Sequence, residues 1–163
     1  MPNHYPRIDK IFTSLHNDFS FVALDLLMGY HQIPVREEDR PKTAFITHKD
    51  LYVFNEMPFG LCNAPATFQR LMDGIFRDEI GKDRAAYLDD LLMYALRHVE
   101  MLPILDRTLG QLIDAGLKCK PLKCQVFPDS IQYLRHIIKD GKIAADRKKT
   151  GQDPRMALSK NRQ

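Results

Sequence analysis

The chain has 163 residues, of which 44% are hydrophobic, so it is long and apolar enough for one domain-sized core. Its formal net charge is only +3, which excludes a polycation, and any binding to a phosphate backbone has to come from local basic patches. The three cysteines form no CxxC pair, which favours a reducing compartment, and no apolar run is long enough for a signal core or a membrane span. We therefore expect a soluble protein that is not secreted and has no membrane partner.

The first half of the chain alternates helix and strand patterns. A short helix is predicted over residues 6–15, and a β-prone run over residues 19–24 ends at Asp25. The apolar runs 45–47 and 51–54 flank a turn and predict a hairpin. A helix is predicted from Pro65 to Gly81, and its buried face is made of residues at helical spacing: Phe68, Leu71, Met72, Ile75 and Phe76.

The second half continues with a hairpin, a helix and two strands. Residues 85–94 form two apolar segments joined at Asp89 and Asp90. A helix over residues 99–115 is predicted to end at Gly116 and to bury one side, made of Leu102, Leu105, Leu109, Leu112 and Ile113. Pro103 predicts a kink or a later start, because proline inside a helix costs about 3 kcal/mol. Residues 131–134 and 137–138 are strand candidates. We expect a domain over residues 1–146 and a disordered basic tail over residues 147–163.

The hairpin over residues 85–94 carries its two charged side chains, Asp89 and Asp90, next to each other. Asn-Gly and Asp-Gly are the usual turn residues, and Asp-Asp relieves less backbone strain. Two like charges a few ångströms apart require a positive partner, and divalent cations bind carboxylate oxygens. A solvated acidic turn is an equally good interpretation of this hairpin alone, because Asp is common in turns.

A third carboxylate favours the metal interpretation. Asp25 ends a core strand, where an unpaired acid is costly. If that strand lies beside the hairpin, Asp25, Asp89 and Asp90 converge at the strand ends. Such a cluster binds two Mg²⁺ ions about 3.5 to 4 Å apart, the geometry of in-line phosphoryl displacement. The three acids are therefore predicted as catalytic residues and metal ligands, with Mn²⁺ able to replace Mg²⁺.

Five sequence blocks follow one another in a recognisable order. They are Leu24-Asp25-Leu26 with residues 29–33, then residues 41–45, residues 57–69, Tyr87-Leu88-Asp89-Asp90 and residues 116–124. This order resembles the reverse transcriptases of gypsy-type LTR retrotransposons, and Tyr87-Leu88-Asp89-Asp90 is similar to the YxDD box of that family. Four residues recur by chance, whereas five ordered blocks over about 120 residues are a specific signal. The resemblance covers residues 6–148.

The resemblance implies an α+β polymerase palm, with an antiparallel sheet backed by helices, part of the fingers and the disordered basic C-terminal tail. It also implies an RNA-directed DNA polymerase, a nucleotidyltransferase that extends a primer on an RNA or DNA template with dNTPs by two-metal catalysis. The chain would be a fragment of a retroelement polyprotein, with RNase H and integrase as partners. Its expected location is a cytoplasmic retroelement particle or the nucleus.

The resemblance further implies roles for single residues. Tyr30 would lie under the sugar of the incoming nucleotide and exclude a 2′-hydroxyl; simple packing beside its strand is the alternative. Leu26, Phe59 and Gly60 would contact the nucleotide, with an ordinary loop as the alternative for Phe59-Gly60. Lys123 would protonate the departing pyrophosphate, or it belongs to a solvated basic edge.

Three departures from the family pattern put activity in doubt. Leu27 and Met28 stand where the family commonly has a small polar pair such as Arg-Ser, beside the triphosphate. Arg135 replaces the glycine of a Tyr-Leu-Gly-His block. The family's fingers strands, which carry the basic clamp for the triphosphate, are expected upstream of the first matched residue. The alternative function is therefore a catalytically inactive retroelement remnant with at most weak nucleic-acid binding.

Overall fold

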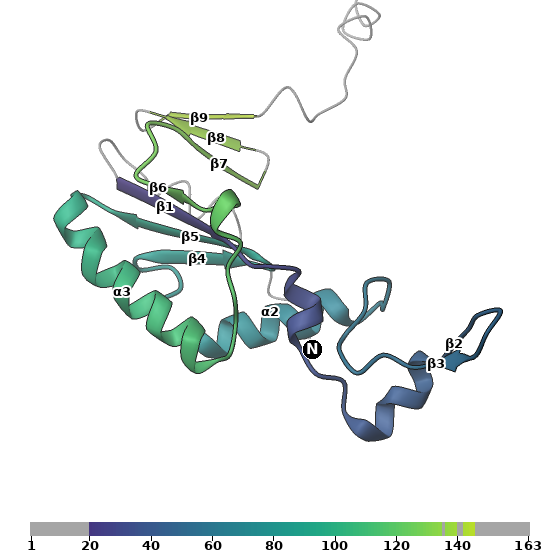
Figure 1. The fold of residues 1–163 in the computed structure, drawn as a ribbon. Coiled ribbons are helices and arrows are strands. Elements are labelled where there is room, and N and C mark those ends of the chain that lie inside the picture. The colour runs from purple at the N-terminus through teal and green to yellow at the C-terminus, as the bar shows by residue number, and fades with distance from the viewer. Residues whose placement is uncertain (1–19, 135, 140–141, 146–163) are drawn as a thin grey trace, which may run out of the picture.

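The computed structural model describes residues 20–134, 136–139 and 142–145, and its centre is a four-stranded antiparallel sheet (Figure 1). The strands are β1 (Ser20–Asp25), β4 (Arg84–Tyr87), β5 (Asp90–Ala95) and β6 (Gln125–Val126), in the order β4-β5-β1-β6. Strand β1 pairs with β5 over its full length, from Ser20 opposite Ala95 to Asp25 opposite Asp90. The strand that ends at Asp25 and the acidic hairpin are therefore direct neighbours.

Both faces of this sheet are covered. Val22 and Leu24 of β1 belong to the core under the helices α2 (Ala64–Ile75) and α3 (His98–Asp114). Phe21 points to a second core, against β7 (Ile131–Tyr133) and β8 (His136–Lys139), which form a three-stranded antiparallel sheet with β9 (Lys142–Ala145). Figure 1 shows the two helices on one side of the central sheet and β7–β9 on the other. Because side chains alternate between two apolar environments, the strands have nearly continuous apolar sequences.

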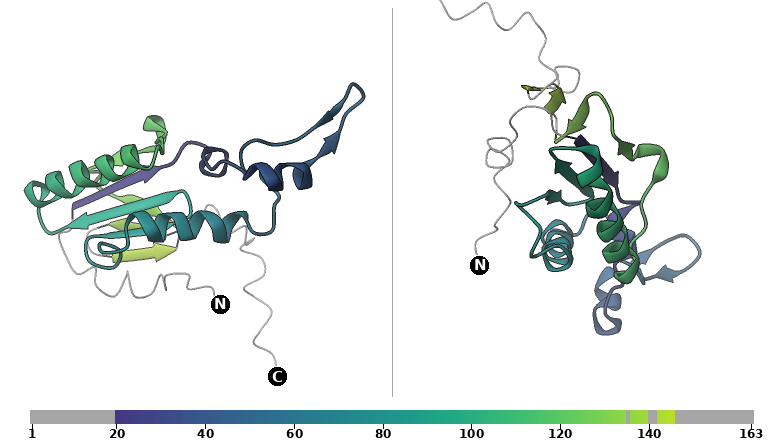
Figure 2. Two further views of the ribbon diagram at one scale, coloured as in Figure 1. Left: turned by 90° about the horizontal axis from the view of Figure 1, so that it is seen from below. Right: turned by 90° about the vertical axis from the view of Figure 1, so that its left-hand side faces the viewer.

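Short elements connect these layers. The 3-10 helices are η1 (Gly29–Gln32), η2 (Glu37–Thr43) and η3 (Pro121–Lys123). Strands β2 (Phe45–Ile46) and β3 (Leu51–Tyr52) form the predicted hairpin, which projects from the rest of the molecule (Figure 2). Its rings pack on one another, with centroids 5.8 Å apart for Phe45 and Tyr52, but its side chains are exposed.

The ends of the two long helices differ in how well the sequence predicts them. Helix α2 ends at Ile75, not at Gly81, and the prediction is wrong because a turn intervenes: the N–H groups of Glu79 and Ile80 donate to Phe76 O. Helix α3 ends as predicted before Gly116, whose φ is +71°. The Gly116 N–H donates to Ile113 O and the Leu117 N–H to Leu112 O, which is a Schellman motif.

The buried face of α2 is confirmed, whereas the predicted face of α3 is only partly right: Leu112 lies in the core and Leu105 packs against it, but the other three residues are exposed. Leu102, Leu109 and Ile113 are 56%, 39% and 74% exposed. The side that faces the core consists of Met101, Ile104, Thr108 and Leu112. Burial of Thr108 costs little because its hydroxyl donates to Ile104 O at 2.6 Å.

Helix α3 also begins at His98 and contains Pro103, so of the two expectations for this proline the later start is wrong, and a kink stays a prediction. Strands β7 and β8 confirm the two late strand candidates, and β9 was not predicted. The helix over residues 6–15, Arg135, the domain boundary at residue 146 and the tail over residues 147–163 lie outside the described residues. Within the described residues, every helix is too short or too polar to cross a membrane.

Candidate active site

Two carboxylates form the last pair of the β1–β5 ladder. Asp25 and Asp90 are Cα partners, and side chains directly opposite in an antiparallel pair share one face, with Cβ atoms about 4.5–5.5 Å apart. The Asp25 side chain is only 19% exposed. Because like charges at this separation repel each other, the pair needs a positive neighbour.

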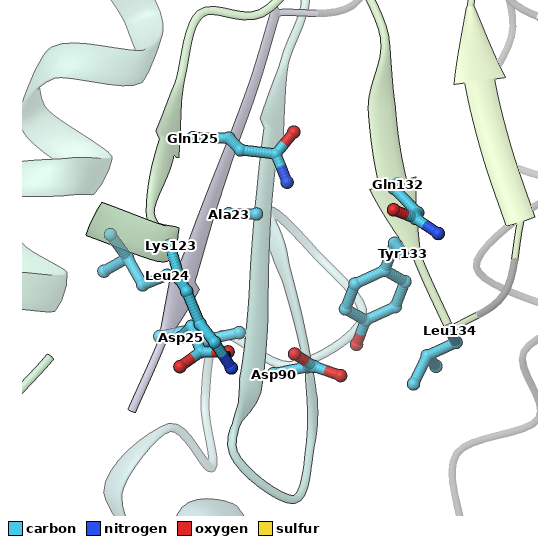
Figure 3. Close-up of a pocket in the computed structure, with 10 residues that line it drawn as sticks. Ala23, Leu24, Asp25, Asp90, Lys123, Gln125, Gln132, Tyr133 and Leu134 are labelled. Carbon is cyan, nitrogen blue, oxygen red and sulfur yellow. Dashed lines mark hydrogen bonds and ion pairs between the residues drawn. The ribbon is translucent and has the colours of Figure 1, made fainter. Parts of the chain in front are cut away.

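In the structure this neighbour is Lys123, whose Nζ lies 3.1 Å from Asp25 Oδ2 (Figure 3). The backbone guides it there, since the Lys120 N–H donates to Asp25 O at 2.8 Å and η3 follows directly. The hydrogen bond to Asp25 and its charge raise the pKa of Lys123, and the charges of Asp89 and Asp90 add to this effect. The charges of all three predicted acids therefore stabilise the protonated form of the Lys123 ammonium group.

Asp89 lies in the turn between β4 and β5. The turn residues are Leu88 and Asp89, and the interpretation of Asp89-Asp90 as the turn pair needs correction: Asp90 is the first residue of β5 and pairs with Tyr87. Leu88 has a left-handed φ of 53°, so this residue carries the backbone strain of the turn. The Leu26 N–H donates to Asp89 O at 3.0 Å and fastens the turn to the end of β1.

A cavity of about 450 Å³ opens beside Asp25 and Asp90 (Figure 3). Its lining includes Asp25, Asp90, Lys123, Gln125 and Tyr133. Among the residues that the structure describes, no group of three or more His, Cys, Asp or Glu side chains is arranged to hold a metal ion. The acids share one end of the sheet, but Asp25 binds an ammonium. Their donor atoms are all carboxylate oxygens, which suit a hard divalent cation, and the Lys123 ammonium shows that a positive charge fits at Asp25.

Two of the residues predicted to contact a nucleotide, Tyr30 and Phe59, form a second group beside α2. The ring centroid of Tyr30 lies 5.3 Å from that of Phe59 and 5.7 Å from that of Phe68. Phe59 is 62% exposed. Gly60 has a φ of +94°, which favours glycine, and nothing lies within 4 Å of an added Cβ. Leu26 is only 1% exposed, so its side chain belongs to the core and its backbone alone adjoins the acids.

The unusual pair Leu27 and Met28 is exposed directly after Asp25 and Leu26. The side chain of Gln32 fixes this segment: its Nε2 donates to Leu27 O at 2.7 Å and to Lys118 O at 3.0 Å, and its Oε1 accepts the Lys118 N–H at 2.6 Å. The exposed side chains of Leu27 and Met28 thus belong to a backbone segment that Gln32 links to Lys118 by hydrogen bonds.

Two further residues were part of the matched blocks without being predicted as site residues. An added Cβ at Gly29 would lie 2.8 Å from Phe68 Cζ and 3.4 Å from Asp89 Cβ, so glycine allows η1 to approach the acidic turn. Gln69 of α2 is buried and accepts the Leu88 N–H at 2.9 Å. Neither role has a signal in a single sequence, because both depend on contacts between distant segments.

The antiparallel sheet, the helices behind it and the acids at its end define the palm of a nucleic-acid polymerase. The reverse transcriptase (RNA-dependent DNA polymerase) family matches residues 2–138. The chain belongs to this family, as the ordered blocks predict.

Relatives and solved structures agree with this assignment. The chain is 38% identical over 144 residues to the Pol polyprotein from transposon gypsy of Drosophila melanogaster, covering 86% of this chain and 14% of that protein. It is 38% identical over 151 residues to the Pol polyprotein from transposon opus, covering 91% of this chain and 15% of the relative. The foamy viral protease-reverse transcriptase in complex with RNA/DNA hybrid has a TM-score of 0.80 at 21% identity, over 91% of this chain and 20% of that one. This likeness shows the shared fold.

Proposed function

We propose that the chain carries the palm active site of an RNA-directed DNA polymerase, which extends a primer with dNTPs on an RNA or DNA template. The observation that carries this proposal is the register of β1 and β5, which sets Asp25 opposite Asp90 with Asp89 in the adjoining turn. Because the chain spans only about 14% of the length of the gypsy polyprotein, the proposal concerns the activity of a parent polyprotein with further domains, such as RNase H and integrase.

Asp25, Asp89 and Asp90 are proposed to hold two Mg²⁺ or Mn²⁺ ions. When bound, such ions increase the acidity of the primer 3′-hydroxyl and stabilise the departing pyrophosphate. The chain's own contribution is to hold three carboxylates at one sheet end, on backbone fixed by the Leu26–Asp89 hydrogen bond. Lys123 is protonated beside Asp25, and its Nζ has to leave that carboxylate before it can give a proton to the pyrophosphate oxygen.

Tyr30 and Phe59 are proposed to form the sugar-binding side of the nucleotide site. Their rings contact each other, and the ring of Tyr30 also contacts Phe68. These ring contacts fix the position of the Tyr30 ring. Placed below C2′ of the incoming nucleotide, the ring would overlap a 2′-hydroxyl and so exclude it.

One observation favours the second candidate, a catalytically inactive remnant that binds nucleic acid weakly. Leu27 and Met28 expose apolar side chains at the segment that follows Asp25. Apolar groups next to a triphosphate provide no hydrogen bonds or charge to replace its lost hydration.

Primer extension distinguishes the two candidates. The chain is assayed alone and joined to the segment that precedes the matching region in the gypsy polyprotein, with Asp89→Asn in each form. Extension by the joined protein that depends on Mg²⁺ and is lost in Asp89→Asn would support the polymerase. A joined protein that is folded and binds primer-template but extends no primer would support the remnant.

A further inference from the structure

Gln69 is a buried polar residue on the side of α2 that faces the acidic hairpin. Gln69 is only 5% exposed, and both the oxygen and the nitrogen of its amide have hydrogen-bond partners. Oε1 accepts the Leu88 N–H at 2.9 Å, and Nε2 donates to Ala86 O at 3.2 Å and to Asp73 Oδ1 at 2.8 Å. One helix side chain thus binds two backbone groups of the segment that leads into the acids.

The turn needs such support because of its backbone conformation. Leu88 has a φ of 53°, a region that side chains other than glycine, asparagine and aspartate rarely adopt. The β4–β5 ladder ends at the pair Tyr87 and Asp90, so the Leu88 N–H lies beyond the ladder and turns toward α2. The backbone conformation of Leu88 therefore determines where the next residue, Asp89, is placed.

Two other contacts hold the same turn from different sides. The Leu26 N–H donates to Asp89 O, and Gly29 lies so close that an added Cβ would be 3.4 Å from Asp89 Cβ. Phe68, the neighbour of Gln69 in α2, packs against Gly29. Among these contacts, only the one from Gln69 is made by a side chain that hydrogen-bonds the turn, and it acts on Leu88, the turn residue with a left-handed φ.

We infer that Gln69 is a positioning residue: it holds Leu88 in its left-handed conformation and thereby keeps Asp89 beside Asp25 and Asp90. It contacts no substrate, and cation binding by the three acids depends on it. This inference rests on the proposed function. A buried glutamine that only contributes to folding is the competing interpretation, and the chain offers a control for it.

The control is Gln111 of α3, which makes the same number of hydrogen bonds away from the acids. Its Oε1 accepts from Arg84 Nη1 at 2.9 Å, and its Nε2 donates to Ile75 O and Glu79 Oε1, both at 3.3 Å. Gln69→Met and Gln111→Met therefore each remove an amide that makes three hydrogen bonds, from a buried position at Gln69 and a half-buried one at Gln111. Each is compared with the wild-type chain for thermal unfolding, hydrogen exchange of the Leu88 and Asp89 amides by NMR, and Mn²⁺ affinity by electron paramagnetic resonance at a temperature where both variants are folded.

The expected result is faster exchange at Leu88 and a loss of Mn²⁺ affinity of about tenfold or more in Gln69→Met, since groups that orient metal ligands typically contribute that much. Gln111→Met should change the unfolding temperature only. Equal Leu88 exchange in the two variants, or equal Mn²⁺ affinity, would overturn the inference.

A second variant covers the case in which Gln69→Met does not fold. In Gln69→Glu with Asp73→Asn one glutamate oxygen still accepts the Leu88 N–H and the other accepts from the new asparagine, while the donation to Ala86 O is lost. Leu88 exchange close to wild type in this variant supports the inference, and fast exchange contradicts it. If the wild-type chain bound no Mn²⁺, the proposed function would fail, and Leu88 exchange alone would then decide the role of Gln69.

Discussion

Lys123 contacts Asp25 at the oxygen where a divalent cation would bind. Its ammonium is 3.1 Å from Oδ2, and an ammonium and a metal ion repel each other at one carboxylate. We expect Lys123→Met to increase Mn²⁺ affinity by no more than about fivefold, because 57% of the Lys123 side chain is exposed and exposed ion pairs are weak. Lys82→Met, on an exposed turn, is the control. Affinity equal in the two variants would show that Lys123 does not compete with the metal.

The pKa of Lys123 fixes how this effect depends on pH. Asp25 raises that pKa above its ordinary value of 10.5. The contribution of the ion pair to stability is therefore present below about pH 10.5 and is lost as the pH rises through the higher pKa of the folded state. The ratio of the Mn²⁺ affinities of Lys123→Met and Lys82→Met should be constant between about pH 7 and 9, where Lys123 keeps its proton in the wild type.

Tyr30 offers a test of sugar selection. Its ring is supported by Phe59 and Phe68, and dispersion alone contributes only about 0.1 to 0.2 kcal/mol per atom pair, so exclusion of a hydroxyl has to be steric. In the chain joined to the upstream gypsy segment, Tyr30→Ala should incorporate ribonucleotides far more readily, whereas Tyr30→Phe keeps the ring and should keep the selection. The measurement is the ratio of dNTP to rNTP incorporation. An unchanged ratio in Tyr30→Ala would reduce Tyr30 to a packing residue.

The sequence predicts the acids better than it predicts their supports. Asp25 and Asp90 stand out because a charge at the end of an apolar strand is costly without a partner, and the structure pairs them. Gln69 does not stand out, because one glutamine inside an amphipathic helix is common and its partner Leu88 is 19 residues away. Lys123 is an intermediate case. The matched block includes it, but its contact with Asp25 depends on the position of η3, which the sequence does not predict.

Helix α3 shows why an element can be predicted while its orientation is not. Two stripes at helical spacing overlap on it, and the more apolar one, with Leu102, Leu109 and Ile113, faces outward. The inward stripe contains Thr108, which looks polar in the sequence but satisfies its hydroxyl inside the helix. The register of a helix on a sheet depends on the neighbouring side chains, which periodicity does not contain.

The two stripes of α3 differ in what they contribute to stability, and a matched pair measures this. Leu112 is 2% exposed and Leu109 is 39% exposed. Leu112→Ala should lower the free energy of unfolding by about 2 to 5 kcal/mol, because it leaves a cavity in the core. Leu109→Ala should lower it by less than about 1 kcal/mol. The measurement is equilibrium denaturation with urea, and equal losses would mean that the outward stripe is covered in solution.

At the scale of the whole molecule, the sheet is covered on both faces and the acids lie at one of its ends. The cores on the two faces fix β1 against β5, and this pairing brings together two carboxylates that are 65 residues apart in the sequence. The architecture is predictable from the ordered blocks because the family shares it. The covering by β7–β9 is predicted only in part, since β9 has no clear strand pattern.

Asp25, Asp89 and Asp90 are proposed to form one site for divalent cations, and Mn²⁺ binding tests this proposal most directly. The isotherm is measured by electron paramagnetic resonance for the wild-type chain, for Asp25→Asn, Asp89→Asn and Asp90→Asn, and for Asp78→Asn, which changes an exposed acid after α2. We predict saturable binding to the wild type and to Asp78→Asn, and affinity weaker by about tenfold or more in each of the other three variants. Equal affinity in all five proteins would contradict a shared site at the end of β1 and β5.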